Sequence, residues 1–261
     1  ARSHMPGAGT QDAALVFGGY TTAPQASHIN KDTEAFDGIS WTVGNLMITS
    51  HYAHAGAGTQ NDALAAVYTT AEEYNGSTWA SAGGKITSTS YLNAVGSSTN
   101  AALAVGSNTQ TEEYDGTVWT VRPSKNDIAY ASAAGGTATA AIWFGGAANT
   151  APTAYRTEEW NGVNWSASTP MINFRRYHMG FGTQNAAVSV GGCPPPAAIS
   201  CTEEWNGSTW SASGPLITAR YSGTCNIGNV SNGMIAGGAT PAYACTEMYN
   251  GGTFHGTLSA W

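Results

Sequence analysis

One nine-residue phrase recurs six times along this chain of 261 residues, and it constrains the fold more than any other feature. The six copies read TEAFDGISW, AEEYNGSTW, TEEYDGTVW, TEEWNGVNW, TEEWNGSTW and TEMYNGGTF. Their closing aromatic residues lie 38 to 46 residues apart, at Trp41, Trp79, Trp119, Trp165, Trp210 and Phe254. That period is typical of a four-stranded propeller blade. A unit of this length cannot bury its own apolar faces, so neighbouring copies must stack into a ring.

Each copy predicts four short strands, named a, b, c and d in chain order. In the fifth copy these are RYHMGFGTQ, NAAVSVGG, CTEEWNG and STWSAS, all bounded by turn signals and rich in small, β-branched or aromatic residues. We therefore predict an all-β fold in one domain, a six-bladed β-propeller of four-stranded antiparallel blades. The blades would span approximately 6–50, 51–89, 90–128, 129–174, 175–218 and 219–261.

The two ends of the chain bear on how the ring closes. Residues 1–5, ARSHM, resemble a cloning remnant, and we expect them to lie outside the fold. Strand a of the first blade would begin near Gly7 and the last blade would end on its own strand d, so we predict closure without strand exchange. Strand a begins with a tyrosine in every blade but the first, at Tyr52, Tyr91, Tyr130, Tyr177 and Tyr221. We expect Trp261 to fill the corresponding place beside the first blade.

The turn between strands c and d carries the same dipeptide in every copy. Asn-Gly or Asp-Gly recurs there, with the first residue at Asp37, Asn75, Asp115, Asn161, Asn206 and Asn250. Asn-Gly tolerates positive φ at both central residues, which a type I′ hairpin turn requires. We therefore predict two-residue type I′ turns.

Glycine pairs close strand b in four of the six copies. They are Gly18 and Gly19, Gly145 and Gly146, Gly191 and Gly192, and Gly237 and Gly238. With an aromatic residue in strand c and a tryptophan opening strand d, the chain resembles the kelch-type β-propeller family over residues 7–261. The second and third copies read AAVYTT and AAVGSN and lack the glycine pair. The TEEYNGSTW sequence is similar to propeller repeats of bacterial and phage-encoded proteins. The resemblance implies a binding or structural scaffold, in a phage or bacterial surface assembly.

Residues that recur in every copy are expected to be structural. We predict that the six closing aromatics pack between adjacent blades with the strand c aromatics, as Trp119 would with Tyr114. The alternative is a lectin-like platform for carbohydrate, with similar pockets near Trp160 and Trp205. The first glutamate of each phrase is invariant, at Glu34, Glu72, Glu112, Glu158, Glu203 and Glu247. Ring symmetry would hold these carboxylates too far apart to share a metal ion, so we expect them to accept backbone or tyrosine hydrogen bonds.

Charge and hydropathy exclude some partners. The formal net charge is −7, and no basic cluster exceeds the pair Arg175 and Arg176, so the field that nucleic acid requires is missing. No run of about eighteen apolar residues marks a membrane span. We expect a soluble monomer with no cofactor and with a protein or glycan ligand. A virion or extracellular location would fit such a protein.

Four cysteines lie in the last third of the chain, at Cys193, Cys201, Cys225 and Cys245. None forms the CxxC spacing of a zinc site, and we predict no metal site. Cys193 and Cys201 flank the loop CPPPAAISC, where they could close a disulfide or remain free thiols.

The candidate binding face follows from the strand order. Successive antiparallel strands place the b–c loops beside the d–a loops, opposite the Asn-Gly turns, and the b–c loops vary most in length. Arginine and tyrosine are enriched at binding hot spots. On this face we predict a polar ligand site formed by Tyr20, His28, His51, Tyr155, Arg156, Arg176, Arg220 and Tyr243.

Strand a should face the central channel, into which His54, Asn93, Ser132 and His178 would project. The chain carries no GxSxG, HExxH, P-loop or GxGxxG motif, so we predict no catalytic residue and no enzymatic activity. The hypothesis we favour is a ligand-recognition propeller that binds on its long-loop face. The alternatives are a carbohydrate-binding lectin and a propeller hydrolase or oxidase.

Overall fold

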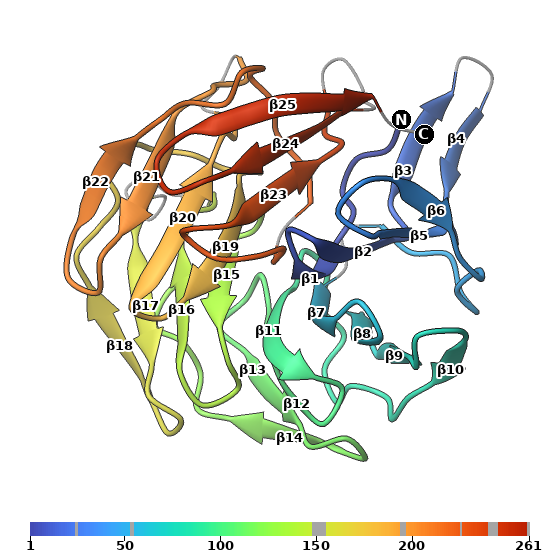
Figure 1. The fold of residues 1–261 in the computed structure, drawn as a ribbon. Coiled ribbons are helices and arrows are strands. Elements are labelled where there is room, and N and C mark those ends of the chain that lie inside the picture. Colours follow the sequence, from blue (N-terminus) through green and yellow to red (C-terminus); the bar gives the residue numbers. More distant parts are fainter. Residues whose placement is uncertain are drawn as a thin grey trace.

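The structure is a computed structural model of the 261-residue chain. It describes all residues except 24–25, 53–54, 148–154, 194–196, 225, 240–244 and 260–261, and it leaves the side chains of 22–27 and 257–259 undescribed. The described residues form an all-β, six-bladed β-propeller, with six small sheets arranged around a central channel (Figure 1). The predicted fold class is confirmed.

Five of the sheets contain four antiparallel strands each, in meander order. The first comprises β1 (Gly7–Thr10), β2 (Ala13–Phe17), β5 (Thr33–Phe36) and β6 (Trp41–Val43); the second β7 (Ala55–Thr59), β8 (Asp62–Val67), β9 (Thr70–Tyr74) and β10 (Trp79–Ser81). The third comprises β11 (Asn93–Ser98), β12 (Ala101–Val105), β13 (Thr111–Tyr114) and β14 (Trp119–Arg122); the fourth β15 (Ala133–Gly136), β16 (Ala141–Phe144), β17 (Thr157–Trp160) and β18 (Trp165–Ser168). The fifth comprises β19 (Met179–Thr183), β20 (Ala186–Val190), β21 (Thr202–Trp205) and β22 (Trp210–Ser213).

The sixth sheet is less regular. It contains β23 (Gly233–Ala236), β24 (Cys245–Tyr249) and β25 (Phe254–Ser259). Residues 224 and 226–228 lie beside β23 in the place of an innermost strand, held by a hydrogen bond from Thr224 N to Ala236 O and by a bridge between Gly228 and Gly233. The long b–c connection of blade one adds a separate hairpin of β3 (Tyr20–Ala23) and β4 (Ala26–Ile29).

Six apolar clusters fill the six interfaces between blades. In each blade the strand c aromatic packs on the closing aromatic with ring centroids 4.8 to 5.5 Å apart. Five of these pairs pack on the preceding blade, as Tyr114 and Trp119 pack on Leu64 of blade two. At the last junction Phe36 and Trp41 of blade one pack on Met234 of blade six. The ring therefore closes by face packing, and no strand is exchanged among the described residues.

The invariant glutamates hold the loops that lead into their own blades. Glu203 Oε2 accepts a hydrogen bond from Ile172 N at 2.8 Å, and its Oε1 accepts one from Asn173 N at 3.0 Å. Equivalent pairs of backbone amides bind Glu72, Glu112, Glu158 and Glu247. The structural role expected for these carboxylates is confirmed, while the tyrosine hydrogen bonds go to the neighbouring glutamates, as from Tyr114 to Glu73 at 2.7 Å.

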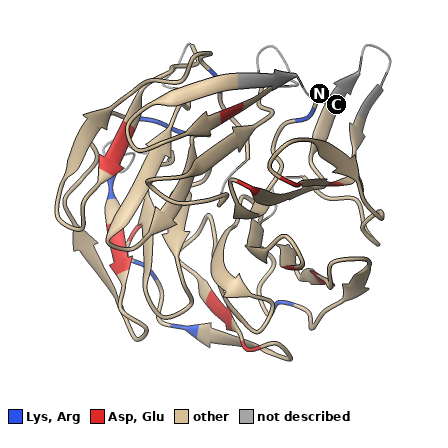
Figure 2. Ribbon diagram, viewed as in Figure 1, with Lys and Arg blue, Asp and Glu red and all other residues tan. Residues whose placement is uncertain are grey.

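A cation accompanies most of these carboxylates. Arg175 and Arg220 pair with the glutamates of blades five and six, and all four side chains are fully buried. Lys85 Nζ lies 2.7 Å from Glu112 Oε1. Burial alone would raise the pKa of Glu112, but hydrogen bonds from Lys85 and the loop outweigh it and hold that pKa below its usual range. Figure 2 shows acidic positions on the third strand of successive blades beside sparse basic positions.

The expectation that residues 1–5 lie outside the fold is wrong. Arg2 is 3% exposed, and its guanidinium lies 2.5 Å from Glu34 Oε2, as Arg175 lies beside Glu203 in blade five. The carbonyl of Arg2 accepts a hydrogen bond from Gly238 N of blade six, and Ser3 bridges to Tyr20. This segment therefore completes blade one and joins it to blade six. Trp261, which we expected to act there, lies outside the described residues.

The expectation of type I′ turns at the Asn-Gly and Asp-Gly dipeptides is also wrong in blades one to five, where one glycine alone has positive φ; in blade six Gly251 and Gly252 both have positive φ. In blade two the last paired residues are Tyr74 and Trp79, so the loop holds four residues rather than two. Gly76 has φ of +86°, but Asn75 does not have positive φ. Instead, Asn75 Oδ1 accepts hydrogen bonds from Ser77 N and Thr78 N. The dipeptide is needed for an Asx turn with one left-handed glycine.

Candidate functional site

Tyrosines surround the mouth of the central channel on the face that carries the b–c loops. Tyr130 contacts Tyr91 and Tyr177, with ring centroids 6.1 and 6.5 Å apart. Tyr177 in turn contacts Tyr221 at 6.1 Å, and Tyr52 contacts Tyr20 at 6.1 Å on the opposite side. These six rings, here called the tyrosine ring, are exposed or half-buried. They combine apolar faces with phenol hydroxyls, which suits binding of an amphipathic ligand.

The backbone at the mouth has an unusual conformation. Tyr91, Ala131, Tyr177, Ser222 and His4 all have positive φ, between 50° and 56°, although none is glycine. Such residues are uncommon and often gather at functional sites. Three hydrogen bonds connect them across blades: from Tyr177 N to Ala131 O, from Ser222 N to Tyr177 O and from His4 N to Ser222 O, all at 2.8 Å. This backbone belt fixes the positions from which the aromatic side chains project.

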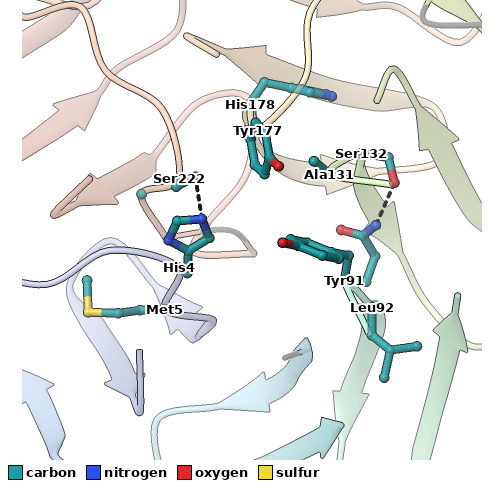
Figure 3. Close-up of a pocket in the computed structure, with 11 residues that line it drawn as sticks. His4, Met5, Tyr91, Leu92, Ala131, Ser132, Tyr177, His178 and Ser222 are labelled. Atoms are coloured by element: carbon teal, nitrogen blue, oxygen red, sulfur yellow. Dashed lines mark hydrogen bonds between the residues drawn. The ribbon is translucent and has the colours of Figure 1, made fainter. Parts of the chain in front are cut away.

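A cavity of about 80 Å³ lies inside this belt. Tyr91, Tyr177 and His4 project toward it (Figure 3). On one side Ser222 Oγ lies 3.1 Å from His4 Nε2, and on the other Asn93 Nδ2 donates to Ser132 Oγ at 2.9 Å. Burial lowers the pKa of His4, so this imidazole is neutral near pH 7. The lining is therefore polar but uncharged.

A wider hollow of about 530 Å³ adjoins the cavity on the side of blade one. His4, Tyr20, Tyr52 and Tyr91 line it, and Ile29 at the end of β4 forms its wall. The hairpin is the longest described b–c connection, so the symmetry of the six blades is broken at this point. A hollow of this size is within the range of small-ligand sites.

The channel residues differ in what they offer to a ligand. Asn93, Ser132 and His178 all border the cavity as expected, and His54 lies outside the described residues. His178 is fully buried, its Nδ1 lies 2.9 Å from Ser189 Oγ, and burial followed by the Arg175 charge lowers its pKa to about 3. Further down, the side chain of Asn226 crosses the channel and donates to the carbonyls of Gly56 and Ala94.

Four of the eight predicted ligand residues belong to the b–c connections of blades one and four, and they do not lie together. Tyr20 belongs to the tyrosine ring. His28 is exposed on β4, on the hairpin. Tyr155 is 39% exposed and contacts Phe174, and Arg156 pairs with Asp127 at 2.7 Å. The last two are therefore associated with blade four rather than with the mouth.

The other four predicted residues have different environments. Arg220 is fully buried against Glu247, and His51 is buried with Nε2 3.6 Å from Glu72 Oε1, so both have structural contacts within the frame. Arg176 is half-buried, with Cζ 5.7 Å from the centroid of the Tyr177 ring. Tyr243 lies outside the described residues.

The repeated indoles do not offer interblade sites for carbohydrate. Trp160 and Trp205 are at most 1% exposed, and their Nε1 atoms donate to the carbonyls of Ala138 and Gln184.

Cys193, Cys201 and Cys245 are free thiols, and Cys225 is outside the described residues. Within the described ranges, no group of three His, Cys, Asp or Glu side chains is placed to hold a metal ion.

His4 was missed because residues 1–5 were expected to lie outside the fold, and Ser222 was missed because the prediction took residues that precede the strand a tyrosines rather than residues that follow them. A signal was present in the order of residues. Arg2-Ser3-His4 precedes the Gly-x-Gly of β1 as Arg175-Arg176-Tyr177 precedes that of β19, with His4 in the place of Tyr177.

Comparison with known proteins gives no identity for the chain. No protein-family model matches it, and no curated protein sequence matches it. Among the described residues, no helix is long and apolar enough to span a membrane.

Proposed function

We propose that this chain is a non-enzymatic binding module that takes its ligand at the tyrosine ring, on the face that carries the b–c loops. The observation that carries the proposal is the coincidence, at one place, of six aromatic rings, a cavity and a belt of five non-glycine residues in the left-handed region. Aromatic and polar side chains fixed on a rigid frame are preorganised for binding, which reduces the entropic cost of association.

The chemistry of the lining supports binding rather than catalysis. No carboxylate or thiol borders the cavity or the hollow among the described residues. Its two histidines both have lowered pKa values, so neither is tuned to exchange protons near pH 7. We also propose that the blades are kelch-type repeats and that the protein belongs to a phage or bacterial surface assembly. The repeated TEEYNGSTW-type sequence supports both proposals.

Tyrosine variants test this proposal directly. The labelled chain is applied to a glycan array and to a displayed peptide library, and each binder found is titrated against the variants Tyr91→Ala and Tyr177→Ala. Alanine substitution at a binding hot spot typically costs 2 kcal/mol or more, so we expect affinity to fall about 30-fold or more.

Tyr68→Ala provides a matched control. Tyr68 has φ of +49° and is 45% exposed, but it borders neither the cavity nor the hollow. We expect this variant to bind as the parent chain does. Equal losses in all three variants, binders that ignore all three, or no binder in either collection would count against the proposal.

A further inference from the structure

Among the described residues, Arg176 is the one arginine for which the structure shows no carboxylate, carbonyl or sulfur partner. All 16 Asp and Glu residues of the sequence lie within the described part of the chain, so every side-chain carboxylate is accounted for. The other arginines contact acidic side chains, at Glu34, Glu113, Asp127, Glu203 and Glu247. The Nε of Arg176 is buried without a hydrogen-bond partner. A guanidinium in this state is suited to receive an anion.

The position of Arg176 places this charge at the mouth. Its carbonyl accepts a hydrogen bond from Cys193 N, just as the carbonyl of Tyr130 accepts one from Ala147 N. Arg176 therefore occupies in blade five the place that Tyr130 occupies in the tyrosine ring. Its guanidinium lies over the Tyr177 ring, whose pKa is raised chiefly by burial while the Arg176 charge acts in the opposite direction.

The mouth offers little to an extended peptide. Strand-like recognition of a peptide requires free backbone donors and acceptors. The amides of His4, Tyr177 and Ser222 are already used in the belt, and Tyr130 N donates to Ala147 O. Recognition must therefore come from side chains, chiefly aromatic faces and hydroxyls.

A sugar ring has the complementary surface. Its C–H face is apolar and can pack on an aromatic ring, while its hydroxyls can bond to phenols and to the polar groups of His4, Ser222 and Asn93. The hollow of about 530 Å³ is large enough for a short saccharide, and the inner cavity of about 80 Å³ admits only a substituent. A neutral sugar would leave Arg176 without an anion.

We propose that the ligand bound at the tyrosine ring is an acidic saccharide, whose ring packs on the tyrosines and whose carboxylate or sulfate pairs with Arg176. This inference rests on the proposed function and names the ligand class for that site. Because an ion pair at a half-buried side chain is screened by dissolved ions, the contribution of Arg176 to binding should weaken as salt is added.

Saturation-transfer NMR and calorimetry with three probes test the inference: an oligomer of glucuronic acid, a sulfated oligosaccharide and the neutral glucose oligomer of equal length. We expect at least one acidic probe to bind at least tenfold more tightly than the neutral one. Arg176→Met should remove that preference without reducing the affinity for the neutral probe, and Arg176→Lys should retain part of it. Carboxylate and sulfate are distinguished by which acidic probe binds.

Arg122→Met is the control for net charge, because Arg122 is 42% exposed on β14 and pairs with Glu113 far along the blade from the channel. It should leave the preference unchanged. If neither acidic probe binds, if Arg176→Met has no effect, or if an acidic peptide is bound through Arg176 in place of the sugars, the inference is overturned. If Tyr177→Ala abolishes binding of the probes while Arg176→Met leaves the affinities for the acidic and the neutral probes unchanged, the inference fails and the proposed binding site stands. If neither tyrosine variant alters any binding, the proposed function fails as well.

Discussion

The buried pair of Arg175 and Glu203 gives the sharpest test of how the blades are connected. Both side chains are fully buried, and Arg175 Nη2 lies 2.5 Å from Glu203 Oε1. Burial lowers the pKa of Arg175, while the Glu203 charge opposes this and keeps the guanidinium charged near pH 7. Glu203→Gln removes the counter-charge with little change of shape. The arginine would then have only neutral acceptors as partners, the carbonyls of Gly191 and Cys201 and the amide oxygen of the new glutamine.

Breaking a buried ion pair from one side costs about 3–5 kcal/mol, because one charge remains uncompensated. At roughly 2–4 °C per kcal/mol for a chain of this size, the melting temperature should fall by roughly 6–20 °C. Urea unfolding followed by tryptophan fluorescence measures the same loss as a lower midpoint. Arg175→Met should also destabilise the protein, but less, because Glu203 keeps the amides of Ile172 and Asn173.

The double variant completes the cycle. Because neither charge remains, Arg175→Met combined with Glu203→Gln should be more stable than the sum of the two single effects predicts, by about 2 kcal/mol or more. Glu113→Gln is the control, since Glu113 pairs with Arg122 on the surface and its loss should cost at most about 1 kcal/mol. A Glu203→Gln variant as stable as this control would refute the idea that the invariant glutamates hold the loops.

Two further predictions concern other cations of the frame. Arg2→Met should destabilise the ring by about 3 kcal/mol, because Arg2 binds Glu34 and the carbonyls of Gly18 and Asp32. Urea unfolding measures this loss. A loss no larger than that of Arg122→Met would contradict the structural role of the N-terminal segment. Lys125 has its pKa lowered to about 8, chiefly by burial, and its Nζ lies 4.3 Å from the Trp143 ring centroid. The unfolded chain then binds more protons than the native state above pH 8, so stability should rise by about 2 kcal/mol between pH 8 and pH 10, and Lys125→Met should abolish this rise.

Periodicity predicted the architecture because it depends on residues that every blade needs. The aromatic of strand c and the closing aromatic pair in all six blades, and both positions are visible in the phrase itself. The backbone hydrogen bonds to the first glutamate of each phrase were predicted because this glutamate is present in all six copies. In contrast, the turn type was wrong because Asn-Gly fits two loop geometries, and only the register between Tyr74 and Trp79 distinguishes them.

The cation that pairs with the first glutamate comes from different sequence positions in different blades, and the sequence alone does not show this. In blades five and six an arginine, Arg175 or Arg220, reaches the glutamate. In blade three the corresponding place is taken by Thr89, and a lysine appears four residues earlier, at Lys85. A cation at either of these two positions can therefore pair with the first glutamate. From the sequence of blade six alone, Arg220 was expected to be an exposed ligand residue. The structure shows that it is buried against Glu247.

The site itself could not be predicted, because it depends on distances between blades that the repeat does not encode. The tyrosines were visible, but in blades three and five they occupy the left-handed position of the belt, at Tyr91 and Tyr177, whereas Tyr130 and Tyr221 precede it. With this alternation, rings from adjacent blades meet at about 6 Å. Likewise, Arg175 and Arg176 are chemically identical neighbours in the sequence. Arg175 is neutralised by a glutamate, whereas Arg176 lies over the Tyr177 ring with no anion beside it among the described residues. The acidic ligand that we infer depends on this assignment of partners, which requires the fold.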